Sequence, residues 1–94
     1  MTYDLADLKL LVSIVEHGTL TEAAARNSLA CSSASARLTK LESELETTLF
    51  IRHRRGLTLT SAGSVVFRHA LKVLDKVTEF DEKLRSISEN NHVR

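Results

Sequence analysis

The last third of the chain carries one apolar seam, and this seam restricts the folds that the chain can adopt. Seven apolar residues follow one another at alternating steps of four and three: Val66, Ala70, Val73, Val77, Phe80, Leu84 and Ile87. This spacing is typical of a helix that packs along a coiled-coil seam, and the sequence contains no proline that would interrupt it. We therefore expect a helix of about 27 residues, which would be about 40 Å long.

A helix of this length needs a second surface to cover its seam. The chain has 94 residues, which is enough for one small domain, and such a domain cannot cover the whole helix by itself. A second copy of the same helix is the natural cover, so the seam predicts the interface of a homodimer, with higher oligomers an option for a longer form. Two alternatives stay open: the helix packs only on its own domain, or it pairs with a different protein in an interaction module without DNA binding.

The N-terminal region predicts two further helices. Gly18 is expected to end the first helix, whose apolar stripe consists of Leu5, Leu8, Leu11, Val12 and Val15. Thr21 precedes a Glu-Ala run at 22–26 and is therefore the expected N-cap of a short second helix. Asn27 ends this helix because it is a poor helix former, and Leu29 then reaches into the core.

A third helix follows the turn at 28–31 and has two different faces. Its buried side is expected to consist of Ala34, Leu38, Leu41 and Leu45, which are spaced by four, three and four residues. Its outer side begins with small and hydroxyl-bearing residues and becomes basic further along. Two short helices joined by such a turn have the dimensions of a helix-turn-helix motif, here at about 20–40.

In that motif the second helix enters the DNA major groove with its N-terminal end. A helix that approaches base edges closely must carry small side chains on its leading surface. Serine hydroxyls can bond to bases or phosphates, Ala36 can touch a thymine methyl, Arg37 can bind guanine and Lys40 can reach a phosphate. The predicted contacts from the motif are Thr21, Ser32, Ser33, Ser35, Ala36, Arg37 and Lys40. The competing interpretation is that these residues are helix caps and solvated charges.

After the third helix, apolar and polar residues alternate. The stretch "FIRHRRGLTL" at 50–59 predicts a two-stranded hairpin with a basic tip. This wing would bring Arg52, Arg54 and Arg55 to the DNA backbone or to a minor groove, where arginine is favoured. A mobile tip without a partner is the alternative. Thr60 and Ser61 are then candidate caps for the long helix.

Charge is unevenly distributed along the chain. The formal net charge is only +1, but residues 26–72 contain eight Lys or Arg and three acidic residues, a local charge of +5. A basic middle between acidic ends favours an anionic partner.

The single cysteine and the absence of a secretory or membrane-spanning segment favour a cytoplasmic protein. We expect no cofactor, no metal site, no small-molecule site and no enzymatic activity, because the motifs of hydrolases, metalloproteases and phosphate-binding loops are absent and the four histidines show no metal-ligand spacing.

The whole pattern resembles the DNA-binding domain of LysR-type transcriptional regulators. The residues that carry the resemblance, without gaps, are Gly18-Thr19-Leu20-Thr21, Ala23-Ala24, Leu41-Glu42, Leu45, Leu49-Phe50, Arg52 and Leu59-Thr60-Ser61-Ala62-Gly63. The resemblance implies a mainly α fold, with a three-helix bundle, a two-stranded wing and a long linker helix that dimerises. It also implies a bacterial, cytoplasmic, sequence-specific transcription factor that binds double-stranded DNA.

Some residues depart from the family pattern. Ala30 stands where the family has a capping serine, so Cys31 or Ser32 is left as the candidate cap. Ala36 stands where the family has arginine, with Arg37 one residue later.

The chain is predicted to divide into a winged helix-turn-helix domain at 1–62, a linker helix at 63–90 and a tail at 91–94. Family members continue into an effector-binding domain, so we expect this chain to be the DNA-binding portion alone.

Overall fold

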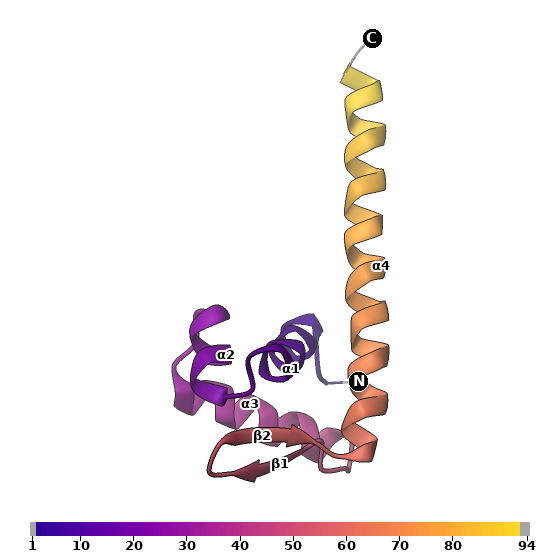
Figure 1. Cartoon of the computed structure of the whole chain (residues 1–94). Helices are drawn as coiled ribbons and strands as arrows, with labels where there is room; N and C mark the ends of the chain where they lie inside the picture. The colour runs from indigo at the N-terminus through magenta and orange to yellow at the C-terminus, as the bar shows by residue number, and fades with distance from the viewer. Residues whose placement is uncertain (1, 93–94) are drawn as a thin grey trace.

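The computed structural model describes residues 2–92 and contains four helices and one hairpin (Figure 1). In chain order these elements are α1 (Leu5–His17), α2 (Leu20–Arg26), α3 (Cys31–Glu44), β1 (Phe50–His53), β2 (Gly56–Leu59) and α4 (Ser61–His92). The first three helices form a bundle, the hairpin lies along α3, and α4 rises from the bundle as a rod. The predicted architecture, a mainly α winged helix-turn-helix with a long final helix, is confirmed.

The core of the bundle forms around α1, which is closed at both ends. Asp4 and Asp7 make a reciprocal capping box, in which each carboxylate accepts from the other residue's backbone N–H at 3.0 Å. Gly18 ends the helix in the left-handed conformation at φ 77°, as the sequence predicted. The buried core residues, apart from the wing and α4, are Leu8, Leu10, Leu11, Val12, Ile14, Ala23, Ala24, Ala34, Leu38, Leu41 and Leu49.

The caps of α2 and α3 differ from the prediction. Thr19, not Thr21, is the N-cap of α2, and its hydroxyl oxygen accepts from the backbone N–H of Glu22 at 3.3 Å. Thr21 lies within the first turn of the helix instead. At α3 the N-cap position belongs to Ala30, whose methyl group accepts no hydrogen bond, and Cys31 and Ser32 lie inside the helix. The expectation that one of these two residues caps α3 is therefore wrong.

The wing is tied to the bundle at two places. Antiparallel pairing runs from Phe50 opposite Leu59 to His53 opposite Gly56. At the tip end, the backbone N–H of Leu57 donates to the carbonyl of Gly18 at 3.0 Å. Gly56 has φ 136° and approaches that carbonyl so closely that any side chain would collide with it, which explains why this residue is glycine. At the other end, Phe50 is buried in the core.

The start of α4 is anchored to the segment that leads into the wing. Thr60 accepts from the backbone N–H of Gly63 at 2.9 Å and donates to the carbonyl of Thr48 at 2.6 Å, so of the two candidate caps Thr60 is confirmed, whereas Ser61 is the first residue of the helix. Gly63 is buried, and a Cβ there would collide with the carbonyl oxygen of Leu49. The helix therefore leaves the bundle in a direction set by the Thr60 hydroxyl and the close approach at Gly63.

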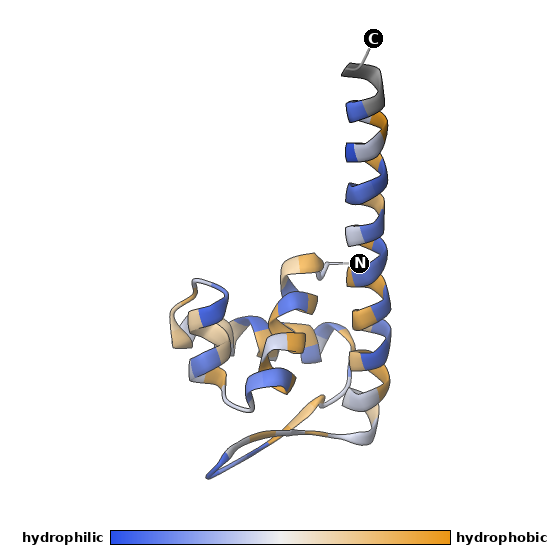
Figure 2. Ribbon diagram, turned by 45° about the horizontal axis from the view of Figure 1, so that its top comes forward, coloured by the Kyte–Doolittle hydropathy of each residue, from blue (hydrophilic) through white to orange (hydrophobic). Residues whose placement is uncertain are grey.

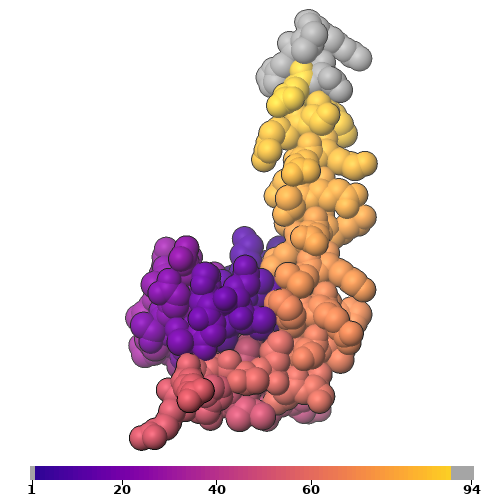
Figure 3. Space-filling model, viewed as in Figure 1, coloured from indigo at the N-terminus to yellow at the C-terminus, as the bar shows by residue number. Residues whose placement is uncertain are grey.

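The long helix has two halves with different surroundings. It begins at Ser61, two residues before the predicted boundary, and it includes two residues of the predicted tail, while 93–94 lie outside the described residues. Its first turns pack on α1, and Ala70 is only 2% exposed within the core. Ala70 is thus covered by its own chain, which corrects its assignment to a dimer seam. Farther along, the rod stands clear of the bundle (Figure 3).

Candidate nucleic-acid interface

The outer surface of α3 is small and polar over its first two turns. Ser32, Ser33 and Ala36 are exposed, whereas Ala34 is buried against the bundle. None of the exposed large apolar side chains among residues 2–89 belongs to α3. This low surface allows close approach by a ligand, and serine hydroxyls both donate and accept hydrogen bonds.

The first turn of α2 lies beside the start of α3. Oγ1 of Thr21 and Sγ of Cys31 are 3.9 Å apart, and both residues are exposed. The structure therefore brings Thr21 next to the serines of α3, as a helix-turn-helix requires. Because Ala30 provides no side-chain cap, backbone N–H groups of the first turn of α3 are available to an outside acceptor.

Arg37 lies on the side of α3 that faces α1. Its Nη1 is 3.6 Å from Oδ1 of Asp7, and Asp7 is the one buried charged residue in the part of the chain that the structure describes. Arg37 is half-buried and Lys40 is exposed, with the Nζ of Lys40 3.7 Å from Oε1 of Glu44. The structure thus gives Arg37 a contact within the bundle that the sequence did not predict.

Arg52 connects the wing to α3. Its Nη1 and Nη2 both lie 3.4 Å from Oγ of Ser35, to which they donate. Ser35 is half-buried and Arg52 is exposed, so one face of the guanidinium remains open. The contact brings two predicted site residues from different elements together and places a positive charge alongside the serine-rich turn.

The tip of the wing carries the remaining two arginines. Arg54 and Arg55 form the turn between the last paired residues, and both are exposed. The space-filling view shows the tip projecting from the body of the molecule below α2 (Figure 3). The tip therefore adds two exposed positive charges to the side of the molecule on which Arg52 meets Ser35 of α3.

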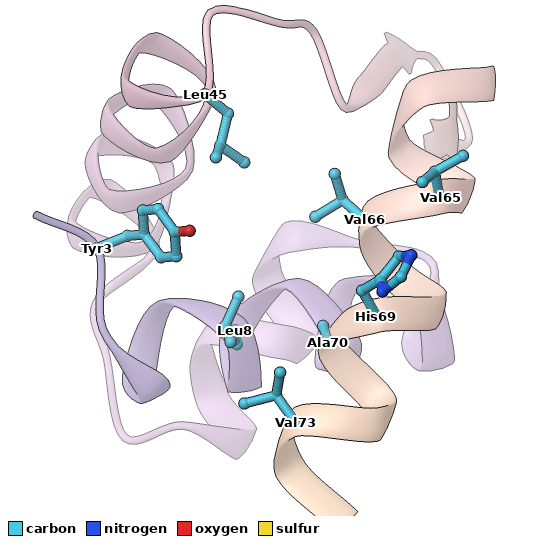
Figure 4. A pocket seen from close by; sticks show the side chains of 8 residues that line it. All are labelled: Tyr3, Leu8, Leu45, Val65, Val66, His69, Ala70 and Val73. Carbon is cyan, nitrogen blue, oxygen red and sulfur yellow. The ribbon is translucent and has the colours of Figure 1, made fainter. Parts of the chain in front are cut away.

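A second surface, mainly apolar, lies on and around α4. An apolar recess of about 270 Å³ lies between the start of the chain, α1, the end of α3 and α4; Leu8, Ala70 and Val73 help to line it (Figure 4). Farther along, Phe80 is 62% exposed, Leu84 and Ile87 are exposed with it, and orange apolar patches recur along this half of the helix (Figure 2).

Several residues that shape the interface were not singled out from the sequence. Glu42 holds the entry to β1, because its Oε2 accepts from the backbone N–H groups of Leu49 at 2.7 Å and Phe50 at 3.3 Å. Asp7 pairs with Arg37, and His53 contacts Thr58 across the wing at 2.7 Å. The Leu-Glu pair of the family pattern pointed at Glu42, but no local signal in the sequence indicated the other two contacts.

Two further features of the described residues bear on other functions. Among them no group of three or more His, Cys, Asp or Glu side chains is arranged to hold a metal ion. No described helix combines the length and the apolar character needed to cross a membrane.

Residues 5–64 match the family described as "Bacterial regulatory helix-turn-helix protein, lysR family". The chain is similar to the HTH-type transcriptional regulator YusT of Bacillus subtilis (strain 168), with 37% identity over 83 residues, which are 88% of this chain and 28% of that protein. It is also 37% identical to the HTH-type transcriptional regulator CzcR of Bacillus cereus over 84% of this chain and 27% of that protein. The chain thus spans about a quarter of the length of these relatives.

A solved structure shows the same architecture. The BenM_DBD/catB site 1 DNA complex matches with a TM-score of 0.87 and 28% identity, over 92% of this chain and 97% of that chain. The family resemblance read from the sequence is therefore confirmed by the fold as well as by the family match, which covers more than half of the chain. This protein belongs to the LysR family of bacterial regulatory helix-turn-helix proteins.

Proposed function

We propose that this chain is the sequence-specific DNA-binding portion of a LysR-type transcriptional regulator. The observation that carries the proposal is that the first turns of α3, whose side chains are small and rich in hydroxyls, lie beside the wing with its three arginines. The contact of Arg52 with Ser35 joins the two elements. The relatives named as transcriptional regulators and the similar fold in a solved DNA complex support it. In this proposal the first turns of α3 enter the major groove of double-stranded DNA.

The proposed contacts divide into two kinds. Ser32, Ser33 and Ala36 are exposed on the leading surface of α3 and would meet base edges, with Arg37 beside them as a donor to guanine. The contacts to phosphates or a minor groove, which hold the protein in register, would come from Thr21, Ser35, Lys40, Arg52, Arg54 and Arg55. Arg37 would have to turn from Asp7 to reach a base, so its role as a base reader is the most demanding part of this assignment.

We further propose that the protein binds DNA as a homodimer through α4. The exposed apolar side chains of the outer half of the helix support a helical partner, because they have no cover in the described chain. The proposed interface keeps Val66, Val73, Val77, Phe80, Leu84 and Ile87 and leaves out Ala70. Two copies related by a two-fold axis would read two half-sites on one face of the duplex.

The division of the chain follows from these roles. Residues 1–62 form the proposed DNA-binding unit, 63–90 the linker and dimerisation helix, and 91–94 its end. A regulator of this kind works in the bacterial cytoplasm, where its DNA is, and its activity is binding rather than catalysis. The alternative, an interaction module that pairs through α4, is not favoured by the family match.

Salt dependence provides the test of DNA binding. If about four cations of each subunit meet phosphates, the affinity of a dimer for duplex DNA should fall with a slope of about −7 in log affinity against log salt. The measurement is a titration of a labelled duplex by fluorescence anisotropy at several salt concentrations. A folded protein without affinity for duplex DNA at low salt would contradict the proposal, and this is the result expected of a pure interaction module.

A further inference from the structure

Besides the backbone bond of Leu57 to Gly18, the tip of the wing is held by an imidazole ring that uses both of its nitrogens. Nδ1 of His53 accepts a hydrogen bond from the backbone N–H of Arg55 at 3.2 Å. Nε2 of the same ring lies 2.7 Å from Oγ1 of Thr58. His53 pairs with Gly56, and Thr58 lies two residues farther along β2, so the two side chains share one face of the hairpin.

The contact with Arg55 indicates the tautomer of the ring. Because the backbone N–H of Arg55 is a donor, Nδ1 must be the unprotonated nitrogen. The neutral ring therefore carries its proton on Nε2, which donates to the hydroxyl oxygen of Thr58. With both nitrogens engaged, the ring joins the last residue of β1 to the turn on one side and to β2 on the other.

Gly56 supplies the positive φ that follows the turn, but neither of the two turn residues carries a side chain that orders it. Two-residue hairpin turns favour pairs such as Asn-Gly, whereas this turn consists of Arg54 and Arg55. Two adjacent positive charges also repel each other. A side chain that accepts from the backbone N–H of the second turn residue supplies the hydrogen bond that Asn or Asp provides in an Asx-turn.

We propose that His53 is a positioning residue that orders the wing tip and so presents Arg54 and Arg55 together to the DNA backbone. This inference rests on the proposed function, since the arginines need a polyanion to bind. Ordering the tip before binding lowers the entropic cost that binding would otherwise carry. Without the ring, both arginines still reach phosphates, but the tip must be ordered during binding.

This role differs from a direct contact and from a purely structural one. Loss of an arginine removes a phosphate contact and lowers the salt slope by about 0.9 for each contact. Loss of the His53 ring lowers affinity without changing the number of phosphates that are met. His53 and Thr58 are both exposed at the periphery of the fold, so their removal should leave the thermal midpoint of the domain nearly unchanged.

The experiment compares His53→Ala, Thr58→Val, their double variant and His53→Asn with the parent chain. The probe is a labelled mixed-sequence duplex of about 30 base pairs, or about three helical turns. His53→Ala should lower the affinity about fivefold at unchanged salt slope, because an immobilised side chain adds a modest ordering cost. Arg54→Ala is the contact control, and its slope should fall. His53→Asn should recover most of the affinity, since an Asn side chain accepts from the same backbone N–H.

Hydrogen exchange provides a readout that does not depend on DNA. The amide of Arg55 should be protected in the parent chain and in His53→Asn, and it should exchange faster in His53→Ala. The double variant should bind no more weakly than His53→Ala, because Thr58 acts through the ring. His53→Ala with unchanged affinity, or with the reduced slope of Arg54→Ala, would overturn the positioning role, as would a failure of His53→Asn to recover binding. A parent chain that binds no duplex would contradict the proposed function, and the positioning role would then fail with it.

Discussion

At the scale of single residues, Glu42 shows how a side chain outside the proposed DNA-binding surface positions part of that surface. Its carboxylate accepts from two backbone N–H groups at the start of β1, so the wing leaves α3 at a defined angle. Glu42→Ala removes the acceptor from both and should lower the free energy of unfolding by about 2 kcal/mol. Urea denaturation measures the free energy of unfolding of this variant, and Glu16→Ala on the exposed side of α1 is the control. Equal effects of the two substitutions would contradict the role of Glu42.

Arg37 is the residue whose role most needs a separate test. It contacts Asp7 within the bundle, and we predict that it also selects a base. Arg37→Ala should therefore change which sequences the protein binds. Asp7→Asn frees Arg37 from α1, so it should keep the base preference while lowering the free energy of unfolding by about 1 kcal/mol. Competition binding with a panel of duplexes measures the base preference of each variant. If Arg37→Ala keeps the base preference of the parent chain, Arg37 does not select a base and serves only to contact Asp7 within the bundle.

At the scale of elements, the direction of α4 depends on the close approach at Gly63. Alanine is normally the better helix former by about 1 kcal/mol, yet a Cβ at this position would collide with the Leu49 carbonyl oxygen. Gly63→Ala should therefore destabilise the domain, by about 2 kcal/mol if backbone has to shift. Ser64→Ala at the next, exposed position is the matched control and should be neutral or slightly stabilising. A stabilising Gly63→Ala would show that the start of α4 is free to adjust.

The elements themselves were predictable because their signals are local and periodic. The apolar stripe and Gly18 located α1, and the alternation at 50–59 located the wing. The cap of α2 was misplaced although Thr19 and Glu22 have the spacing of a capping box, the signal that identifies the true cap. For α4, periodicity identified the apolar face but not which surface packs against it. Ala70 packs in the core of its own chain.

The candidate site was predictable only in part. Residue type and helical spacing correctly placed Ser32, Ser33 and the arginines of the wing on exposed surfaces, whereas Ser35 is half-buried. The contacts of Arg37 with Asp7 and of Arg52 with Ser35 join residues that are distant in the chain, so no local pattern contains them. Such contacts follow from the packing of whole elements, which a single sequence does not encode in any short stretch.

At the scale of the whole molecule, we propose that the outer half of α4 decides the state of assembly. Phe80 and Leu84 are exposed on the rod and do not belong to the core cluster of the bundle, so their substitution should not unfold it. Phe80→Glu with Leu84→Glu should convert the proposed dimer to monomers in analytical ultracentrifugation, because it buries like charges in the seam. Thr78→Glu with Ser86→Glu adds the same charge at exposed positions off the seam and should leave the dimer intact. A dimer that survives the first pair would contradict the α4 interface.

The most direct measurement for the account as a whole is selection of bound sequences from a random pool of duplex DNA by the intact chain. We predict enrichment of one short motif in two copies related by two-fold symmetry, with centres separated by a whole number of turns of about 10 base pairs. A folded, dimeric protein that enriches no motif in dilute salt would contradict the claim that α3 and the wing read DNA sequence.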